Sequence, residues 1–157
     1  MPEIYVDADA CPVKAEAITV ALRHGLVLHM VSNSGIRPHG SPLIRTVLVG
    51  GGMDAADDWI AAHAAAGDLV VTADIPLAAR CVDRGAEVVT PTGRRFGPGN
   101  MGMALAMRNL STELRESGLV QSRVPPFGKQ DRSRFLNVME EVVRELRRRA
   151  EAAPPRT

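Results

Sequence analysis

The sequence predicts an α/β protein with a central, mostly parallel β-sheet and helices on both faces of the sheet. Short apolar runs recur along the first 90 residues, and stretches with helical periodicity fill most of the gaps between them. Because strands and helices alternate, neighbouring strands are expected to run parallel, joined by helices that cross the sheet. The predicted architecture is a three-layer α/β/α sandwich.

Five apolar runs are predicted to form short buried strands. They cover residues 4–6, 27–31, 46–49, 69–71 and 88–89. Three stretches between them have the length of helices, at residues 12–23, 55–66 and 76–84. Pro12 and Pro76 suit a first helical turn. Glycines follow each stretch and are predicted to act as C-terminal caps, at Gly25, Gly67 and Gly85.

The pattern changes after Thr90. The stretch "PTGRRFGPGN" is predicted to be a loop, and a helix is predicted over residues 101–117, with apolar residues on one face at Met103, Met107, Leu110 and Leu114. A last helix is predicted over residues 133–149, with its apolar face formed by Phe135, Met139, Val142 and Leu146. Residues 1–149 are expected to form one domain and residues 150–157 a disordered tail.

Composition narrows the class of protein. A chain of 157 residues is long enough for one domain around one core. It contains no run of about 18 apolar residues and no signal-peptide pattern, so we expect a cytoplasmic protein without a membrane partner. Two cysteines without metal-site spacing are expected to be reduced thiols. Nothing in the sequence indicates an oligomeric state.

Charge is polarised along the chain. Residues 1–90 carry 6 basic and 11 acidic side chains, whereas residues 91–157 carry 13 basic and 7 acidic ones. A basic second half beside an acidic first half suits a protein that grips a polyanion next to a cation-binding pocket. The alternative is a solvated basic face on the last helix.

Acidic residues follow two of the predicted strands. Asp7 and Asp9 lie in the turn after the first strand, and Asp74 follows the strand at 69–71. Since the carboxyl ends of parallel strands line one edge of a sheet, Asp7 and Asp74 are expected to lie close together. An isolated acid at the end of a buried strand favours function over structure, whereas Asp9 could instead shape the turn.

A third acidic stretch opens the predicted second helix. It contains Asp54, Asp57 and Asp58, of which Asp54 and Asp58 are expected to share one helix face. Clustered carboxylates repel one another unless a cation is present, and oxygen ligands favour Mg²⁺ or Mn²⁺. Asp54 could instead cap its helix, as could Asp131 in the last one. The predicted metal ligands are Asp7, Asp9, Asp54, Asp57, Asp58 and Asp74.

Four motifs in order resemble the YaiI/YqxD family of small bacterial proteins, a family grouped with PIN-like nuclease domains. They are "YVDADACPVK", "GMDAADDWI", "LVVTADIPLAARC" and "DRSRFLN", and the resemblance covers residues 4–146. It implies a PIN-like domain with a pocket for one or two divalent ions. Carried over by position, the first-strand acid of such domains is Asp7, the mid-chain acids fall among Asp54, Asp57 and Asp58, and the acid after "VVT" is Asp74.

One departure from this pattern concerns Pro76. Many of the flap-type nucleases among the PIN-like domains have a second acid two positions after the acid that corresponds to Asp74. This chain has Pro76 at that position. A ligand for a second metal is then missing unless Asp9 or Asp131 replaces it. The departure leaves binding of one metal ion intact.

The resulting hypothesis is a divalent-metal-dependent nuclease that hydrolyses phosphodiester bonds, in RNA rather than DNA, with Asp7, Asp58 and Asp74 as catalytic residues. Basic side chains near the pocket edge are predicted to bind a single-stranded nucleic acid through its phosphates, from Lys14, Arg94, Arg95, Arg132 and Arg134. Phe96 and Phe127 are the expected base-stacking residues. Lys14 could equally be a solvated helix residue.

Two other classes remain open. A non-catalytic RNA-binding or regulatory PIN-like module would keep the same pocket without cleaving. A haloacid-dehalogenase-type phosphatase would use Asp7 as nucleophile and Asp9 as acid and base. That class usually has Thr or Val where this chain has Cys11, and it needs a downstream lysine, although no lysine occurs between Lys14 and Lys129.

Overall fold

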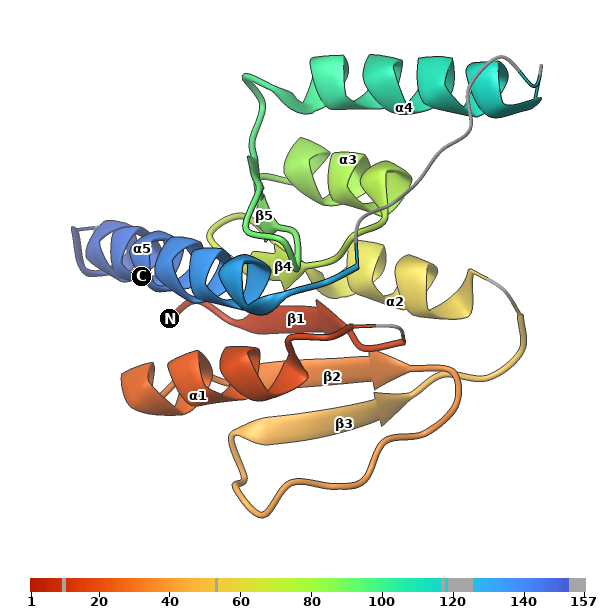
Figure 1. Ribbon diagram of the computed structural model, residues 1–157. Coiled ribbons are helices and arrows are strands. Elements are labelled where there is room, and N and C mark those ends of the chain that lie inside the picture. The colour runs from red at the N-terminus through yellow and green to blue at the C-terminus, as the bar shows by residue number, and fades with distance from the viewer. Residues whose placement is uncertain (10, 53, 117, 119–125, 153–157) are drawn as a thin grey trace.

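The computed structural model describes residues 1–9, 11–52, 54–116, 118 and 126–152. Its centre is a six-stranded sheet in the order β3-β2-β1-β4-β5-β6 (Figure 1). The strands are β1 (Ile4–Asp7), β2 (Leu28–Ser32), β3 (Ile44–Leu48), β4 (Leu69–Val71), β5 (Glu87–Val89) and β6 (Arg95–Phe96). The first five pair in parallel, as predicted, and β6 pairs antiparallel with β5.

Five helices accompany the sheet. They are α1 (Lys14–His24), α2 (Ala55–His63), α3 (Ile75–Asp83), α4 (Met101–Glu116) and α5 (Lys129–Ala152). The predicted cap at Gly25 is present: its φ is 66° and its N–H donates to Ala21 and Leu22. By contrast, α2 ends at His63 with Ala64 as its C-cap residue, so Gly67 does not cap it.

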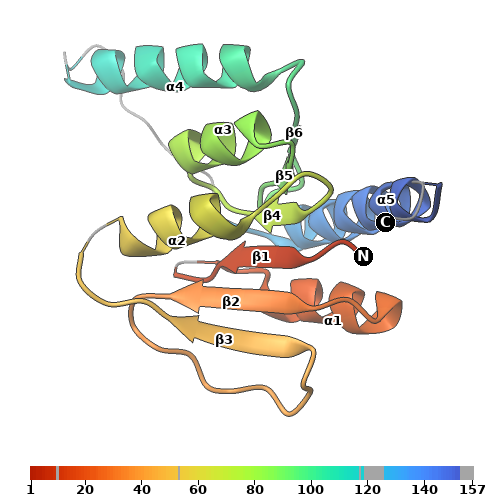
Figure 2. The ribbon, with the colours of Figure 1, turned by 180° about the vertical axis from the view of Figure 1, so that it is seen from behind.

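Successive side chains along the strands point to opposite faces of the sheet, so each face has its own hydrophobic core. Val6, Met30 and Val71 face α1 and α5, whereas Tyr5 and Val70 face α2 and α3. Figures 1 and 2, which view the molecule from opposite sides, show these helix pairs on the two faces. The α/β/α sandwich predicted from the sequence is therefore confirmed.

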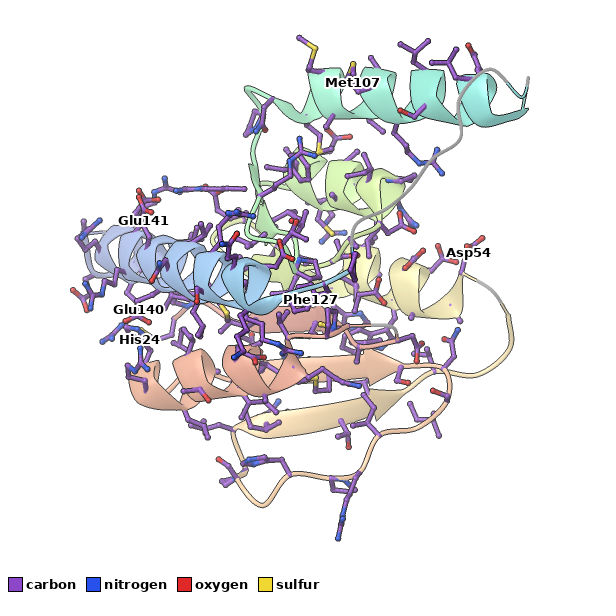
Figure 3. All side chains as sticks on the ribbon, viewed as in Figure 1. His24, Asp54, Met107, Phe127, Glu140 and Glu141 are labelled. Atoms are coloured by element: carbon purple, nitrogen blue, oxygen red, sulfur yellow. The ribbon has the colours of Figure 1, made fainter. Side chains whose placement is uncertain are left out.

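The last helix provides the clearest agreement with its predicted pattern. Phe135, Met139, Val142 and Leu146 are all buried in the core beneath α5. His24 of α1 also contacts α5, because its Nε2 lies 2.9 Å from Glu140 Oε1 (Figure 3). The helix starts at Lys129, earlier than predicted, and continues to Ala152, so residues 150–152 of the expected tail are helical. Residues 153–157 lie outside the described part of the chain.

Two elements differ from the prediction after Thr90. Arg95 and Phe96 form β6 where a loop was expected, because the turn at Thr90–Arg94 brings them back alongside β5. On α4, Met103, Met107 and Leu110 are exposed, so the predicted apolar face is not the buried one. The buried contacts of α4 come from Met101, with partly buried Ala104 and Leu105. This helix packs on α3 at the margin of the molecule (Figures 1 and 2).

The strand order indicates where a ligand-binding site is expected in this sheet. From β1 the chain proceeds to β2 and β3 on one side and then returns to β4 and β5 on the other. In open α/β sheets, ligands bind outside the carboxyl ends of the strands where this reversal occurs. Here that position lies between the ends of β1 and β4. No helix in the described residues is long and apolar enough to cross a membrane.

Candidate functional site

The ends of β1 and β4 are joined by the hydroxyl group of Thr72. Thr72 directly follows β4, is 2% exposed, and donates from Oγ1 to Asp7 Oδ2 over 2.9 Å. The same oxygen accepts the backbone N–H of Asp74 at 3.0 Å. Asp7 and Asp74 are thereby held on either side of one buried hydroxyl. The sequence prediction that these two acids meet agrees with this arrangement.

Asp74 has a structural role in addition to its place at the edge. Its Oδ1 accepts the backbone N–H of Leu77 at 2.9 Å, which caps the N-terminus of α3. Pro76 suits the first turn that follows. Within the described residues, Oδ2 of Asp74 accepts no hydrogen bond, so one carboxylate oxygen has no protein partner there.

Burial and neighbouring charge disfavour ionisation at this edge. Burial raises the pKa of Asp7, and the charges of Asp74 and Asp9 raise it further, against the hydrogen bond from Thr72 that lowers it. For Asp57 on α2, burial and then the charges of Asp74, Asp7 and Asp54 raise the pKa to about 6. Asp57 therefore belongs to the same electrostatic cluster as the two strand acids.

The three acids of α2 occupy different environments. Asp58 points toward α3, where its Oδ1 accepts from Arg80 Nη1 at 2.9 Å on the exposed surface. Asp54 sits at the N-cap position without a side-chain capping bond, and its exposed side chain lies at the start of α2 (Figure 3). The sequence predicted that Asp54 and Asp58 share one helix face. In the structure it is Asp57 whose pKa is raised by the charges of Asp7 and Asp74.

Asp9 is committed to a local hydrogen-bond network. Ser32 donates to its Oδ1 at 2.6 Å, Ser34 donates to the same atom at 3.1 Å, and the N–H of Asn33 donates to its Oδ2 at 2.8 Å. These bonds, with the Ser32 hydroxyl strongest, lower the pKa of Asp9. The arrangement fixes the turn after β1 to the end of β2, which matches the turn-shaping alternative.

Asp131 also has a local partner. It lies in the first turn of α5, and its Oδ2 accepts the N–H of Gly128 at 2.9 Å. A side chain that reaches back to the N-terminal backbone in this way forms half of a capping box. Asp131 therefore stabilises the start of α5, although from the third position inside the helix rather than from the N-cap position.

The acids offer a suitable donor set for a hard divalent cation, although they are not preassembled. Among the described residues, no three His, Cys, Asp or Glu side chains are close enough together to hold a metal ion as they stand. Mg²⁺, however, commonly keeps several waters and uses only one or two protein carboxylates. Asp7 and Asp74 fit that requirement. Burial is the main cause of the raised pKa of Asp57, and the neighbouring negative charges that add to it are ones a cation would offset.

Most of the predicted phosphate-binding cations are already paired. Arg95 forms ion pairs with Glu87 and Glu145, and Arg132 bonds to Glu16 and to the carbonyl oxygen of Pro12. Arg134 contacts Asp131 and the carbonyl oxygen of Thr92. Close packing explains the second contact, because a Cβ on Gly93 would lie 2.6 Å from Cγ of Arg134.

Two of the predicted cations differ from the others. In the described part of the chain, Lys14 and Arg94 form neither a side-chain hydrogen bond nor an ion pair. Lys14 starts α1 and lies near enough to Asp9 to help lower its pKa. The guanidinium carbon of Arg94 lies 5.1 Å from the ring centre of Phe96. These two cations are the ones available to phosphate.

The two expected stacking rings are covered by arginines. Phe96 is 1% exposed beneath Arg94, and Phe127 is half-buried beneath Arg132, whose guanidinium carbon lies 4.9 Å from the ring centre. Phe96 therefore cannot stack directly on a base. Sequence reasoning missed Thr72 because hydroxyls are common, although its position between the strand and Asp74 in "VVTAD" was a usable signal.

The cysteines show no sign of reactivity. Cys11 and Cys81 are both buried free thiols. Burial raises the pKa of Cys11, and it raises the pKa of Cys81 to about 11. Thiolate is the reactive form, so these environments do not suit thiol chemistry at neutral pH.

Comparison with known proteins gives a consistent picture at the level of family. The family model described as "Uncharacterized BCR, YaiI/YqxD family" matches residues 5–145. A UPF0178 protein of Parvibaculum lavamentivorans is 57% identical over 149 residues, covering 95% of this chain and 98% of its own. One from Agrobacterium fabrum is 53% identical over 147 residues, covering 94% and 96%. One from Rhodospirillum rubrum is 49% identical over 147 residues, covering 93% and 98%. No solved structure gives a significant match.

Proposed function

The chain belongs to the uncharacterised YaiI/YqxD family, and on that premise we propose that it is a divalent-metal-dependent nuclease that hydrolyses phosphodiester bonds in single-stranded RNA. The observation that carries the proposal is the electrostatic coupling of Asp7, Asp57 and Asp74 at the reversal point of the sheet. Perturbed acids at such a reversal point favour a functional site over a purely structural one.

Each acid has a separate part in this proposal. Asp7 and the free oxygen of Asp74 would hold Mg²⁺ or Mn²⁺. When bound, the cation would lower the pKa of a coordinated water and stabilise negative charge on the phosphate. Asp57, which belongs to the same cluster, would accept the proton that the coordinated water gives up.

Cations at the same edge support a phosphate-containing substrate. Lys14 is near enough to Asp9 to contribute to its lowered pKa, and Arg94 ends the turn after β5, the neighbour of β4. Within the described residues neither side chain forms an ion pair, so contacts to phosphate would cost no ion pair there. The guanidinium of Arg94 would contact two phosphate oxygens, whereas Lys14 would act as a point charge.

The phosphatase alternative has less support from this arrangement. That mechanism requires the second aspartate to deliver a proton, but Asp9 accepts three hydrogen bonds and its pKa is lowered. A carboxylate held in this way is a poor proton donor at neutral pH.

A non-catalytic RNA-binding module remains a second candidate for a specific reason. The described acids do not form a ready three-ligand group. Such a module would bind RNA through the same cations and use the acids to maintain the edge of the sheet. This candidate differs from the nuclease in one measurable respect, which is cleavage.

Incubation of the full chain with end-labelled single-stranded RNA, in Mn²⁺ and separately in EDTA, tests the proposal. We expect cleavage only with Mn²⁺, and a loss of about 100-fold or more in Asp7→Asn and Asp74→Asn. Asp83→Asn, an exposed acid at the end of α3, is the matched control and should cleave like the parent. RNA binding without cleavage by the parent would favour the non-catalytic module.

A further inference from the structure

A groove between α3 and α4 lies next to the acidic edge. It has a volume of about 350 Å³ and is lined by residues that include Ile75, Arg94, Asn100, Met103 and Met107. Ile75 directly follows Asp74, and Arg94 ends the turn after β5, so two lining residues lie next to the carboxyl ends of β4 and β5. Figures 1 and 2 show α4 beside α3, and Figure 3 labels Met107 on α4.

The walls of this groove combine exposed apolar side chains with positive charge. Met103 is 72% exposed and Met107 is 55% exposed, although both are large apolar residues. Arg94 contributes a positive charge to the lining, and no acidic side chain is among the described residues that form it. The groove is therefore complementary to a ligand that has a flat apolar part and a negative charge.

Arg94 supplies the feature that points to a ligand. Its guanidinium lies over Phe96 and has no ion-pair or hydrogen-bond partner in the described part of the chain. Phe96 is buried, so it holds the guanidinium in place without itself being accessible to a base. A guanidinium held this way can donate hydrogen bonds to phosphate oxygens or stack on the face of a base.

From these observations we propose that the α3–α4 groove binds one nucleotide of a single-stranded polynucleotide, with its base against Met103 and Met107 and its phosphate at Arg94. Methionine suits a base of any identity because its thioether is flexible and polarisable and contacts rings favourably. This inference rests on the proposed function for its substrate class, and it adds the position of a nucleotide beside the acidic edge.

Binding of two oligonucleotides separates the base contact from the phosphate contact. One is a fluorescently labelled single-stranded RNA, and the other has the same backbone and length with each base replaced by hydrogen. Affinities are measured by fluorescence anisotropy in EDTA, so that neither metal binding nor cleavage affects the result. We expect the parent to bind the base-containing strand more tightly.

Two variants of groove residues carry the test. The double substitution Met103→Ala with Met107→Ala should weaken binding of the base-containing strand about fivefold and leave the abasic strand unchanged. Arg94→Gln should weaken both strands and reduce the slope of log affinity against log salt by about 0.7, the value for one phosphate contact on a single strand. Leu48→Ala and Arg45→Gln are matched controls on β3, because both side chains are exposed and lie outside the groove.

Equal affinity of the parent for the two strands, or an equal loss for both strands in the methionine variant, would overturn the proposal. An unchanged salt slope in Arg94→Gln would also overturn it. Failure of the groove proposal can be distinguished from failure of the nuclease proposal. Base-dependent binding without Mn²⁺-dependent cleavage supports the groove and contradicts the nuclease, whereas cleavage without any effect of these variants does the reverse.

Discussion

The hydroxyl group of Thr72 donates a hydrogen bond to Asp7 over 2.9 Å and so ties the ends of two neighbouring parallel strands together at the candidate site. The same hydroxyl accepts the N–H of Asp74. One buried side chain thus positions both strand acids. The hydrogen bond also opposes the effect of burial on the pKa of Asp7.

Thr72→Val should therefore affect both stability and titration. It keeps the shape of the side chain but leaves two groups without their partner, so we expect a loss of about 1–3 kcal/mol in the free energy of unfolding. The pKa of Asp7 should rise further. Urea denaturation and NMR titration of the Asp7 carboxyl group measure the two effects. Thr46→Val, at an exposed position on β3, should change neither.

The titration of Asp57 should make the metal-free protein less stable as the pH rises. Its pKa is about 6 in the folded protein, above the ordinary value of 3.8, so the folded state binds the proton more tightly than the unfolded chain. Stability is therefore lost between these two pH values and the loss is complete above pH 6. Asp57→Asn should melt higher than the parent near pH 7, and the difference should vanish below the ordinary pKa.

Thermal melting in EDTA across this pH range checks the prediction. Asp58→Asn is the control on the same helix, because Asp58 is paired with Arg80 on the surface. If Asp58→Asn raised the melting temperature near neutral pH as much as Asp57→Asn, the effect would be one of general surface charge rather than of the cluster.

Asp74→Asn should separate the capping role of this residue from metal binding. Asparagine is as good an N-cap as aspartate, so α3 should keep its capping bond while the cluster loses one negative charge. Without divalent ions we expect a higher melting temperature than the parent. With Mn²⁺ the parent should gain about 2.7 kcal/mol at one hundred times Kd, and the variant should lose most of that gain.

Asp83→Asn is the control for the metal response. Mn²⁺ should stabilise this variant as much as it stabilises the parent. An equal Mn²⁺ shift in the parent and in Asp74→Asn would count against a metal site at this edge, and the nuclease proposal would fail with it. Asp74→Ala adds an internal check, since removal of the cap should cost about 1 kcal/mol relative to Asp74→Asn whether or not metal is present.

Arg132 should matter more for stability than for nucleic-acid binding. Its Nη1 donates to Pro12 O at 2.7 Å and to Glu16 Oε1 at 2.9 Å, which joins the N-terminal ends of α1 and α5. Because the side chain is 45% exposed, we expect Arg132→Gln to cost about 1 kcal/mol in chemical denaturation. Its effect on RNA affinity should be smaller than that of Arg94→Gln. A larger effect would mean that Arg132 leaves its partners to bind phosphate.

The sequence by itself determined that the sheet is mostly parallel with helices on both faces, and that Asp7 and Asp74 lie at one edge of it. Apolar runs separated by helical periodicity predict parallel strands, and parallel strands bring the residues after their carboxyl ends to one edge. The same reasoning predicted the buried face of α5, because its apolar residues follow the helical period. These features depend on local pattern and on the geometry of regular structure, both of which can be read from the chain.

The tertiary structure alone decided which side chains near that edge are available. Helical spacing places Asp54 with Asp58 as readily as with Asp57, and the choice came from Arg80 on the neighbouring helix, which pairs with Asp58. In the same way, Arg132 meets Glu16 across 116 positions of sequence. Local pattern cannot specify such contacts, since they depend on how separate elements pack, and packing left Arg94 without an ion-pair partner in the described residues.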